Sequence, residues 1–80
     1  MRISSEELDI KLEKILKKVF KIQKINLESS IEDISEWDSF AHFQLMDEIE
    51  VEFKIEIEPN DVIIMTSIPI IKKKIKKNLP

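Results

Sequence analysis

The sequence DSFAHFQLMDEIEVEF, residues 38–53, decides how this chain folds. It opens on Asp38 and Ser39, which are good N-cap residues because a side-chain oxygen there accepts a hydrogen bond from an N–H group of the first helical turn. Apolar residues then recur at steps of three and four, the spacing of one helical face: Phe40, Phe43, Met46, Ile49 and Phe53. We predict a helix over residues 39–53, with Phe43, Met46 and Phe53 in the core.

The outward face of this helix is acidic, since the intervening positions include Asp47, Glu48, Glu50 and Glu52. The acidity extends over residues 28–61, where twelve acidic residues stand against a single lysine, while basic residues predominate on either side. A surface of this sign suits a basic protein partner and would repel nucleic acid. A solvated face that binds nothing is the alternative.

Residues 51–58 fit two structures. Val51, Phe53, Ile55 and Ile57 alternate with charged residues, which is typical of a half-buried strand, and residues 59–61 could turn the chain into a return strand over residues 62–65. Pro59 also suits the first position of a short helix that ends near Met65. A lone hairpin is only marginally stable in water. The pattern alone leaves both structures open.

A second amphipathic helix is predicted near the start of the chain, over residues 5–22. Ser4 followed by Glu7 is the spacing of a capping box. Apolar residues then recur at helical spacing, with most lysines outside the stripe: Leu8, Leu12, Ile15, Leu16, Val19 and Phe20. The lysines near the C-terminal end of this segment would also interact favourably with the negative end of the helix dipole.

The rest of the chain supplies a long connection and a last helix. Residues 23–37 lack helical spacing, and four apolar residues in them are candidate anchors to the core: Leu27, Ile31, Ile34 and Trp37. Thr66 and Ser67 can cap a final helix, whose stripe is Ile68, Ile71, Ile75 and Leu79. We expect residues 1–80 to form one all-α domain, a small four-helix bundle of three longer helices and one short helix, with a long loop between the first two.

Two missing residue types exclude most kinds of small enzyme. The chain has no glycine, so it has no Walker loop and no dinucleotide-binding fingerprint. It has no cysteine, which excludes disulfides, zinc ribbons and a cysteine nucleophile. One histidine cannot form a multi-histidine metal site, and we expect no metal. We also expect a monomer, and because no signal peptide or long apolar run is present, we expect a cytoplasmic chain without a membrane span.

Asp38, Ser39 and His42 lie within five residues and suggest a hydrolytic triad. Such a site needs a base held by a third group and an oxyanion hole of backbone donors. Ser39 and His42 would instead lie one turn apart at an exposed helix end, with no glycine turn beside them. We therefore do not expect self-contained catalysis, and we expect His42 to be a surface residue of the helix.

The same region resembles the carrier site of acyl carrier proteins. The residues that carry the resemblance are Glu36-Trp37-Asp38-Ser39-Phe40, Leu45 and the run from Ile49 to Ile57. Members of that family show an Asp-Ser-Leu motif, an acidic helix with a Glu-Glu-Phe-like end, and then a short stretch of isoleucine and glutamate. The similarity extends over nearly the whole chain. It implies that the second helix ends near Phe53 and that Ile55 and Ile57 are loop residues turned into the core.

The resemblance also implies a function and its site. Ser39 would carry 4′-phosphopantetheine, transferred from coenzyme A by a separate phosphopantetheinyl transferase, and Asp38 would support that site. The arm would hold an acyl group as a thioester, and the chain itself would be no enzyme. Asp47, Glu48, Glu50, Glu52 and Phe40 would face the transferase and the acyl-activating and acyl-transferring enzymes, whose docking patches would be basic. Fatty acid, lipid or specialised acyl pathways would use such a carrier.

The chain departs from the family pattern in ways that bear on the cargo. Phe40 replaces the usual leucine, Trp37 stands where a small residue is common, and Asp47 takes a position that is often apolar. Trp-Asp-Ser with His42 three residues on is more similar to stand-alone carriers outside bulk fatty acid synthesis. An aminoacyl, peptidyl or polyketide carrier is therefore an alternative. An acidic helical adaptor with no prosthetic group is another.

Overall fold

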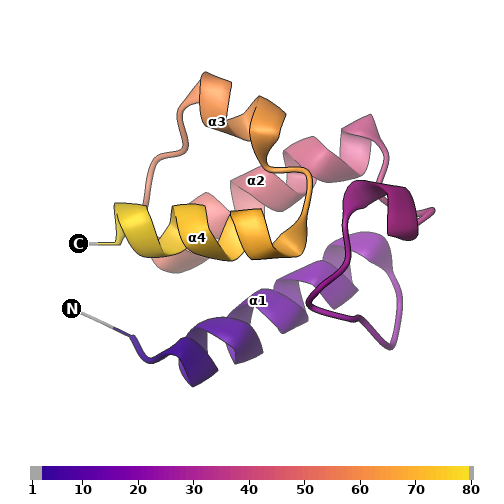
Figure 1. Ribbon diagram of the computed structural model, residues 1–80, viewed down its shortest axis with the longest axis horizontal. Coiled ribbons are helices and arrows are strands. Elements are labelled where there is room, and N and C mark those ends of the chain that lie inside the picture. The colour runs from indigo at the N-terminus through magenta and orange to yellow at the C-terminus, as the bar shows by residue number, and fades with distance from the viewer. Residues whose placement is uncertain (1–2, 80) are drawn as a thin grey trace.

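The computed structural model describes residues 3–79, and its regular structure is helical. Within these residues lie four α-helices and one turn of 3-10 helix (Figure 1). In chain order they are α1 (Ser5–Phe20), the 3-10 turn η1 (Ile31–Asp33), α2 (Ser39–Phe53), α3 (Pro59–Ile64) and α4 (Ile68–Asn78). The expected architecture is confirmed: α1, α2 and α4 are the longer helices, α3 is short, and a long loop joins α1 to α2.

Three of the helices begin at the caps that the sequence predicts. The side chain of Ser4 accepts from the N–H of Glu7, that of Asp38 from the N–H of Ala41, and that of Ser67 from the N–H of Ile70. Each bond satisfies a first-turn N–H group that has no partner within its own helix. The caps therefore fix where α1, α2 and α4 start.

Lysines in the left-handed conformation terminate α1 and α2. Lys21 has φ 57° and Lys54 has φ 55°, and each backbone N–H bonds to the carbonyl four residues earlier. Glycine is the usual residue at such a position because a Cβ atom costs about 1–2 kcal/mol there. A chain without glycine uses lysine instead, and α1 ends two residues before the predicted limit.

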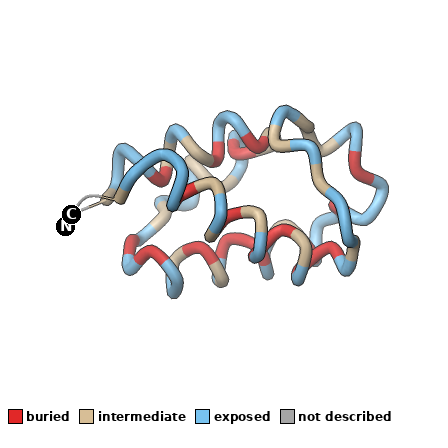
Figure 2. Tube along the Cα trace, turned by 90° about the horizontal axis from the view of Figure 1, so that it is seen from below, coloured by how far each residue is buried: buried red, intermediate tan, exposed pale blue. Residues whose placement is uncertain are grey.

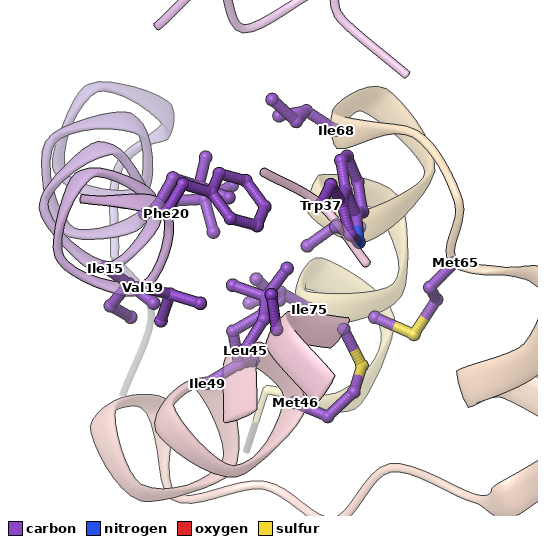
Figure 3. Close-up of a cluster of buried hydrophobic side chains, with 14 of the residues drawn as sticks. Ile15, Val19, Phe20, Trp37, Leu45, Met46, Ile49, Met65, Ile68 and Ile75 are labelled. Atoms are coloured by element: carbon purple, nitrogen blue, oxygen red, sulfur yellow. The ribbon is translucent and has the colours of Figure 1, made fainter. Parts of the chain in front are cut away.

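The core lies between α1, α2 and α4 and includes residues of the connecting loop (Figures 2 and 3). The predicted stripe of α1 is buried throughout, and from the α1–α2 loop Ile34 and Trp37 are buried while Leu27 and Ile31 are partly buried. Residues 29–31 also pair with the start of α4, because Ile31 donates to the carbonyl of Thr66 at 2.8 Å and Ile68 donates to that of Ser29 at 2.9 Å. These bonds fasten the loop that leads into α2.

The buried face of α2 differs from the expected one. Its buried residues are Ala41, Leu45, Met46, Ile49 and Phe53. The expectation that Phe43 belongs to the core is wrong, since Phe43 is 65% exposed, and Phe40 is 79% exposed. Leu45 and Ile49 follow Ala41 at steps of four, and this row faces α1 and α4. Phe40 and Phe43 lie on α2 outside this buried row.

No hairpin forms over residues 51–65, where the structure has the end of α2, a loop and α3. The alternation in the sequence misleads because Val51 is 79% exposed while Phe53 and Ile55 are buried. In a strand these three residues would share one face. Ile55 enters the core as the family resemblance implies, and Ile57 is half-buried. Among the helices of residues 3–79, none combines the length and apolar character that crossing a membrane requires.

Candidate functional site

Ser39 is the first residue of α2 and is exposed. Asp38, and not Ser39, caps the helix. The Oδ1 of Asp38 accepts from the N–H of Ala41 at 2.8 Å, and the backbone carbonyl of Asp38 accepts from the N–H of His42 at 2.9 Å. The N-terminal end of a helix favours an anion through its free N–H groups and its dipole. A negatively charged group on the Ser39 hydroxyl would be stabilised there.

An apolar cleft of about 770 Å³ opens beside Ser39. Its walls come from the loop before α2, the first turns of α2, the segment after α2, and α3. The lining residues are Ile31, Trp37, Asp38, Ser39, His42, Phe43, Ile57, Pro59, Val62, Ile63 and Thr66. A volume of this size is within the range of small-molecule sites, which is about 300–1,000 Å³.

His42 joins two walls of the cleft by hydrogen bonds. The indole Nε1 of Trp37 lies 2.9 Å from its Nδ1, and the carbonyl oxygen of Val62 lies 2.8 Å from its Nε2. An indole N–H can only donate and a carbonyl can only accept. In this geometry Nδ1 is the acceptor and Nε2 is the donor. The imidazole accepts from Trp37 and donates to Val62.

Trp37 is the buried member of this arrangement, with 3% of its surface exposed. Its ring lies 5.3 Å from the ring of Phe20 and 6.0 Å from that of His42, and the second pair is stacked at 26°. Aromatic pairs at these separations contribute about 0.5–1.5 kcal/mol beyond their burial. Trp37 thus ties α1, the loop and the start of α2 together.

These contacts argue against a hydrolytic triad. Both ring nitrogens of His42 already have partners, and the Asp38 carboxylate caps α2. His42 is half-buried between α2 and α3, so the expectation that it is a plain surface residue is wrong. Across residues 3–79, no three acidic or histidine side chains gather closely enough to hold a metal ion.

The acidic residues of α2 have different surroundings. Glu48 pairs with Lys18 of α1 at 3.3 Å, and Glu52 pairs with Lys11 of α1 at 3.5 Å. Glu50 accepts from the backbone N–H of Ile57 at 2.8 Å and so holds the loop after α2. Asp47 is exposed. The acidic face is thus divided between contacts within the chain and the solvent.

Known proteins provide one informative comparison. Neither the family models nor the curated proteins that were compared gave a match. Among solved structures, the chain is similar to the solution NMR structure of the holo acyl carrier protein from Geobacter metallireducens. The TM-score is 0.79 at 29% sequence identity, over 89% of this chain and 83% of that one.

The chain is thus similar to an acyl carrier protein in both fold and sequence. A member of the acyl carrier protein family acts as a carrier and not as a catalyst. Sequence reasoning singles out Ser39, Asp38 and the acidic residues of α2 as candidates, but it misses the bond from His42 to Val62. The two are twenty residues apart, and the acceptor is a backbone carbonyl that no side-chain pattern marks.

Proposed function

We propose that this carrier holds an acyl group as a thioester on a 4′-phosphopantetheine arm attached to Ser39. The observation that carries the proposal is the exposure of Ser39 at the start of a 15-residue helix, beside an apolar cleft. The similar structure is that of a holo acyl carrier protein. The arm would supply a thiol, which this cysteine-free chain lacks. The site fits the arm, because the helix end suits its phosphate and the cleft suits an apolar cargo.

The chain's own residues would present the attachment point. Asp38 caps the first turn of α2, and Ser39 is exposed as the first residue of that turn. The remaining first-turn N–H groups and the helix dipole would favour the phosphate. The apolar cleft walls, such as Phe43 and Ile57, would reduce contact of the cargo with water.

Partner enzymes would dock against α2. They would include a phosphopantetheinyl transferase and enzymes that load and transfer the acyl group, each with a basic patch. Asp47 and Phe40 are both exposed on α2. Glu48 and Glu52 would exchange lysines of α1 for those of a partner. Docking through exposed charges is fast, reversible and sensitive to salt.

We place this function in the cytoplasm, where coenzyme A is available, and in fatty acid, lipid or specialised acyl synthesis. The departures at Trp37 and Phe40 favour a specialised cargo. A polyketide, aminoacyl or peptidyl group on the same arm is the alternative. The physical arrangement at Ser39 is common to all of these.

Intact-mass measurement tests the attachment. The chain is incubated with coenzyme A and a promiscuous phosphopantetheinyl transferase, and we expect a gain of one phosphopantetheinyl group. Ser39→Ala should abolish the gain. Ser35→Ala, which removes another exposed hydroxyl of the same loop region, should leave it intact. No gain on the native chain, or an equal gain on Ser39→Ala, would contradict the proposal.

A matched pair of charge reversals tests the docking face. Asp47→Lys and Glu28→Lys change the net charge equally, but only Asp47 lies on α2. We expect Asp47→Lys to slow modification several-fold at low ionic strength, with the difference shrinking as salt is added. Equal rates for the two variants would show that the transferase responds to net charge and not to α2.

A further inference from the structure

The outer surface of α3 and α4 combines exposed isoleucines with exposed lysines. Ile63 and Ile64 of α3 are 73% and 50% exposed, and Ile70 of α4 is 37% exposed. Lys73 and Lys77 of α4 are exposed as well. We propose that these five residues, the α3–α4 patch, dock the protein on the surface of an anionic membrane. This inference goes beyond the proposed function and does not require a group on Ser39.

Spacing and one ion pair place the basic side of the patch next to α3. Ile70, Lys73, Lys74 and Lys77 are three and four residues apart, so they share one face of α4. The Nζ of Lys74 lies 3.3 Å from Oδ1 of Asp61 in α3. This face of α4 is therefore turned toward α3, which lies alongside it (Figure 1).

The short helix α3 stands at the surface of the molecule. It has six residues, and none of them is buried. Ile64 is its last residue and Ile70 lies in the first turn of α4, so both belong to the corner where residues 65–67 join the two helices. The acidic Glu58 precedes α3, at the opposite end of that helix. The isoleucines thus protrude beside lysines and not beside the acidic segment.

Part of the positive charge of α4 is available to a partner. Residues 62–80 contain five lysines and no acidic residue. Three of these lysines bond to side chains of α1 or α3: Lys72, Lys74 and Lys76. Within residues 3–79, no carboxylate lies within ion-pair distance of Lys73 or Lys77. Their ammonium groups can therefore meet an external anion.

An anionic membrane fits this composition better than an acidic protein does. The anchors of protein interfaces are mostly tryptophan, tyrosine and arginine, and lysine is depleted there. The patch has only isoleucine and lysine. Protruding aliphatic side chains can enter the apolar edge of a bilayer without a preformed socket, and lysines on flexible stems can reach lipid phosphates. The exposed rings of Phe40 and Phe43 lie on α2 instead, where we propose that enzymes dock.

Attachment through the patch would be peripheral and reversible. Three isoleucines bury little surface, and each lysine adds a modest, salt-sensitive attraction to an anionic surface. Ile63 also lines the cleft beside Ser39. A docked chain would therefore hold the cleft close to the lipid.

Vesicle binding tests the proposal. The unmodified chain is mixed with vesicles of phosphatidylglycerol and phosphatidylcholine in equal parts, or of phosphatidylcholine alone, and the bound fraction is measured by sedimentation. We expect binding to the mixed vesicles at low ionic strength, much weaker binding to the neutral ones, and release as salt is added.

A pair of lysine variants separates the patch from net charge. Lys73→Gln combined with Lys77→Gln should weaken binding to the mixed vesicles about tenfold or more. Lys14→Gln combined with Lys24→Gln removes the same charge from exposed positions outside the patch. Because attraction to the surface falls off within a Debye length, we expect this control to bind much as the native chain does.

A pair of apolar variants tests the isoleucines in the same way. Ile64→Gln combined with Ile70→Gln should weaken binding several-fold, because less apolar surface enters the lipid. Ile10→Gln combined with Val51→Gln, at exposed positions on α1 and α2, should leave binding unchanged. All four residues are exposed, so the fold should be retained, which circular dichroism verifies.

Absence of binding to the mixed vesicles at low ionic strength would overturn the proposal, as would equal losses in the patch variants and their controls. Binding to polyglutamate with none to vesicles would also overturn it and would assign the patch to an acidic protein. Ser39→Ala should bind vesicles as the native chain does. A missing mass gain with coenzyme A would count against the proposed function alone, so the two failures are distinguishable.

Discussion

Replacing Glu50 with alanine tests whether this residue holds the loop after α2 or serves mainly to dock partner enzymes. Sequence patterning places Glu50 on the outward face that would meet partners. In the structure its Oε2 accepts from the N–H of Ile57 at 2.8 Å, and its backbone carbonyl accepts from the N–H groups of Lys54 and Ile55. The residue thus organises the turn after α2, and Ile57 is a wall of the cleft. We expect Glu50→Ala to loosen that wall.

The size of the effect follows from the bond that is lost. A hydrogen bond to a charged group contributes about 1.5–3 kcal/mol net. Glu50 is half-buried, so water can replace part of the interaction, and alanine regains a few tenths in helix propensity. We expect a loss of about 1–2 kcal/mol in the free energy of unfolding. Glu50→Gln keeps a neutral acceptor and should lose about half as much.

Urea unfolding followed by far-ultraviolet circular dichroism measures this loss. A domain of this length is stable by about 4–12 kcal/mol, so the variant should remain folded, with an earlier midpoint and an unchanged slope. Asp47→Asn is the control, since Asp47 is exposed on the same helix and should change stability by less than about 0.5 kcal/mol. If Glu50→Ala were no less stable than Asp47→Asn, the carboxylate would not be holding the loop.

Two further substitutions test the ends of α2. Asp38→Ala removes the cap and should cost about 1 kcal/mol of unfolding free energy, together with slower modification of Ser39; a variant as stable as the native chain would show that Asp38 does not cap. Lys54→Gly relieves a left-handed lysine and should raise stability by about 1 kcal/mol in the same urea assay, whereas a loss of stability would show that the left-handed backbone is not strained.

Local rules predicted most of the helical framework. The cap at Asp38 and the limits 39–53 of α2 follow from side-chain chemistry that acts within one turn. The apolar stripe of α1 likewise follows from the helical repeat, which places residues three and four apart on the same face of the helix. These features depend on neighbours in the sequence, so the sequence is sufficient to locate them.

Features that depend on distant neighbours were not predictable in this way. The exposure of Phe43 follows from which side of α2 meets α1, and helical spacing alone leaves that choice open. Apolar and charged residues alternate over residues 51–58, but this segment is the end of a helix followed by a loop, so the alternation does not mark a strand. The partner of His42 is set by where α3 lies. The resemblance to the family corrected the second of these, but it did not correct the first or the third.

Because α2 is a single helix, it fixes the distance between the Ser39 hydroxyl and the acidic residues further along it. Ser39 is its first residue, while the acidic residues begin at Asp47 and end at Glu52. At 1.5 Å per residue, the negative charge lies about 12–20 Å along the axis from the hydroxyl. An enzyme that reaches Ser39 while binding this charge must carry its cations at the same offset from its own active-site entrance. A partner with cations of the right sign at a different offset would bind the carrier with Ser39 out of reach of its active site. Partner selection would therefore depend on the distance between cations and active site as well as on the sign of the charge.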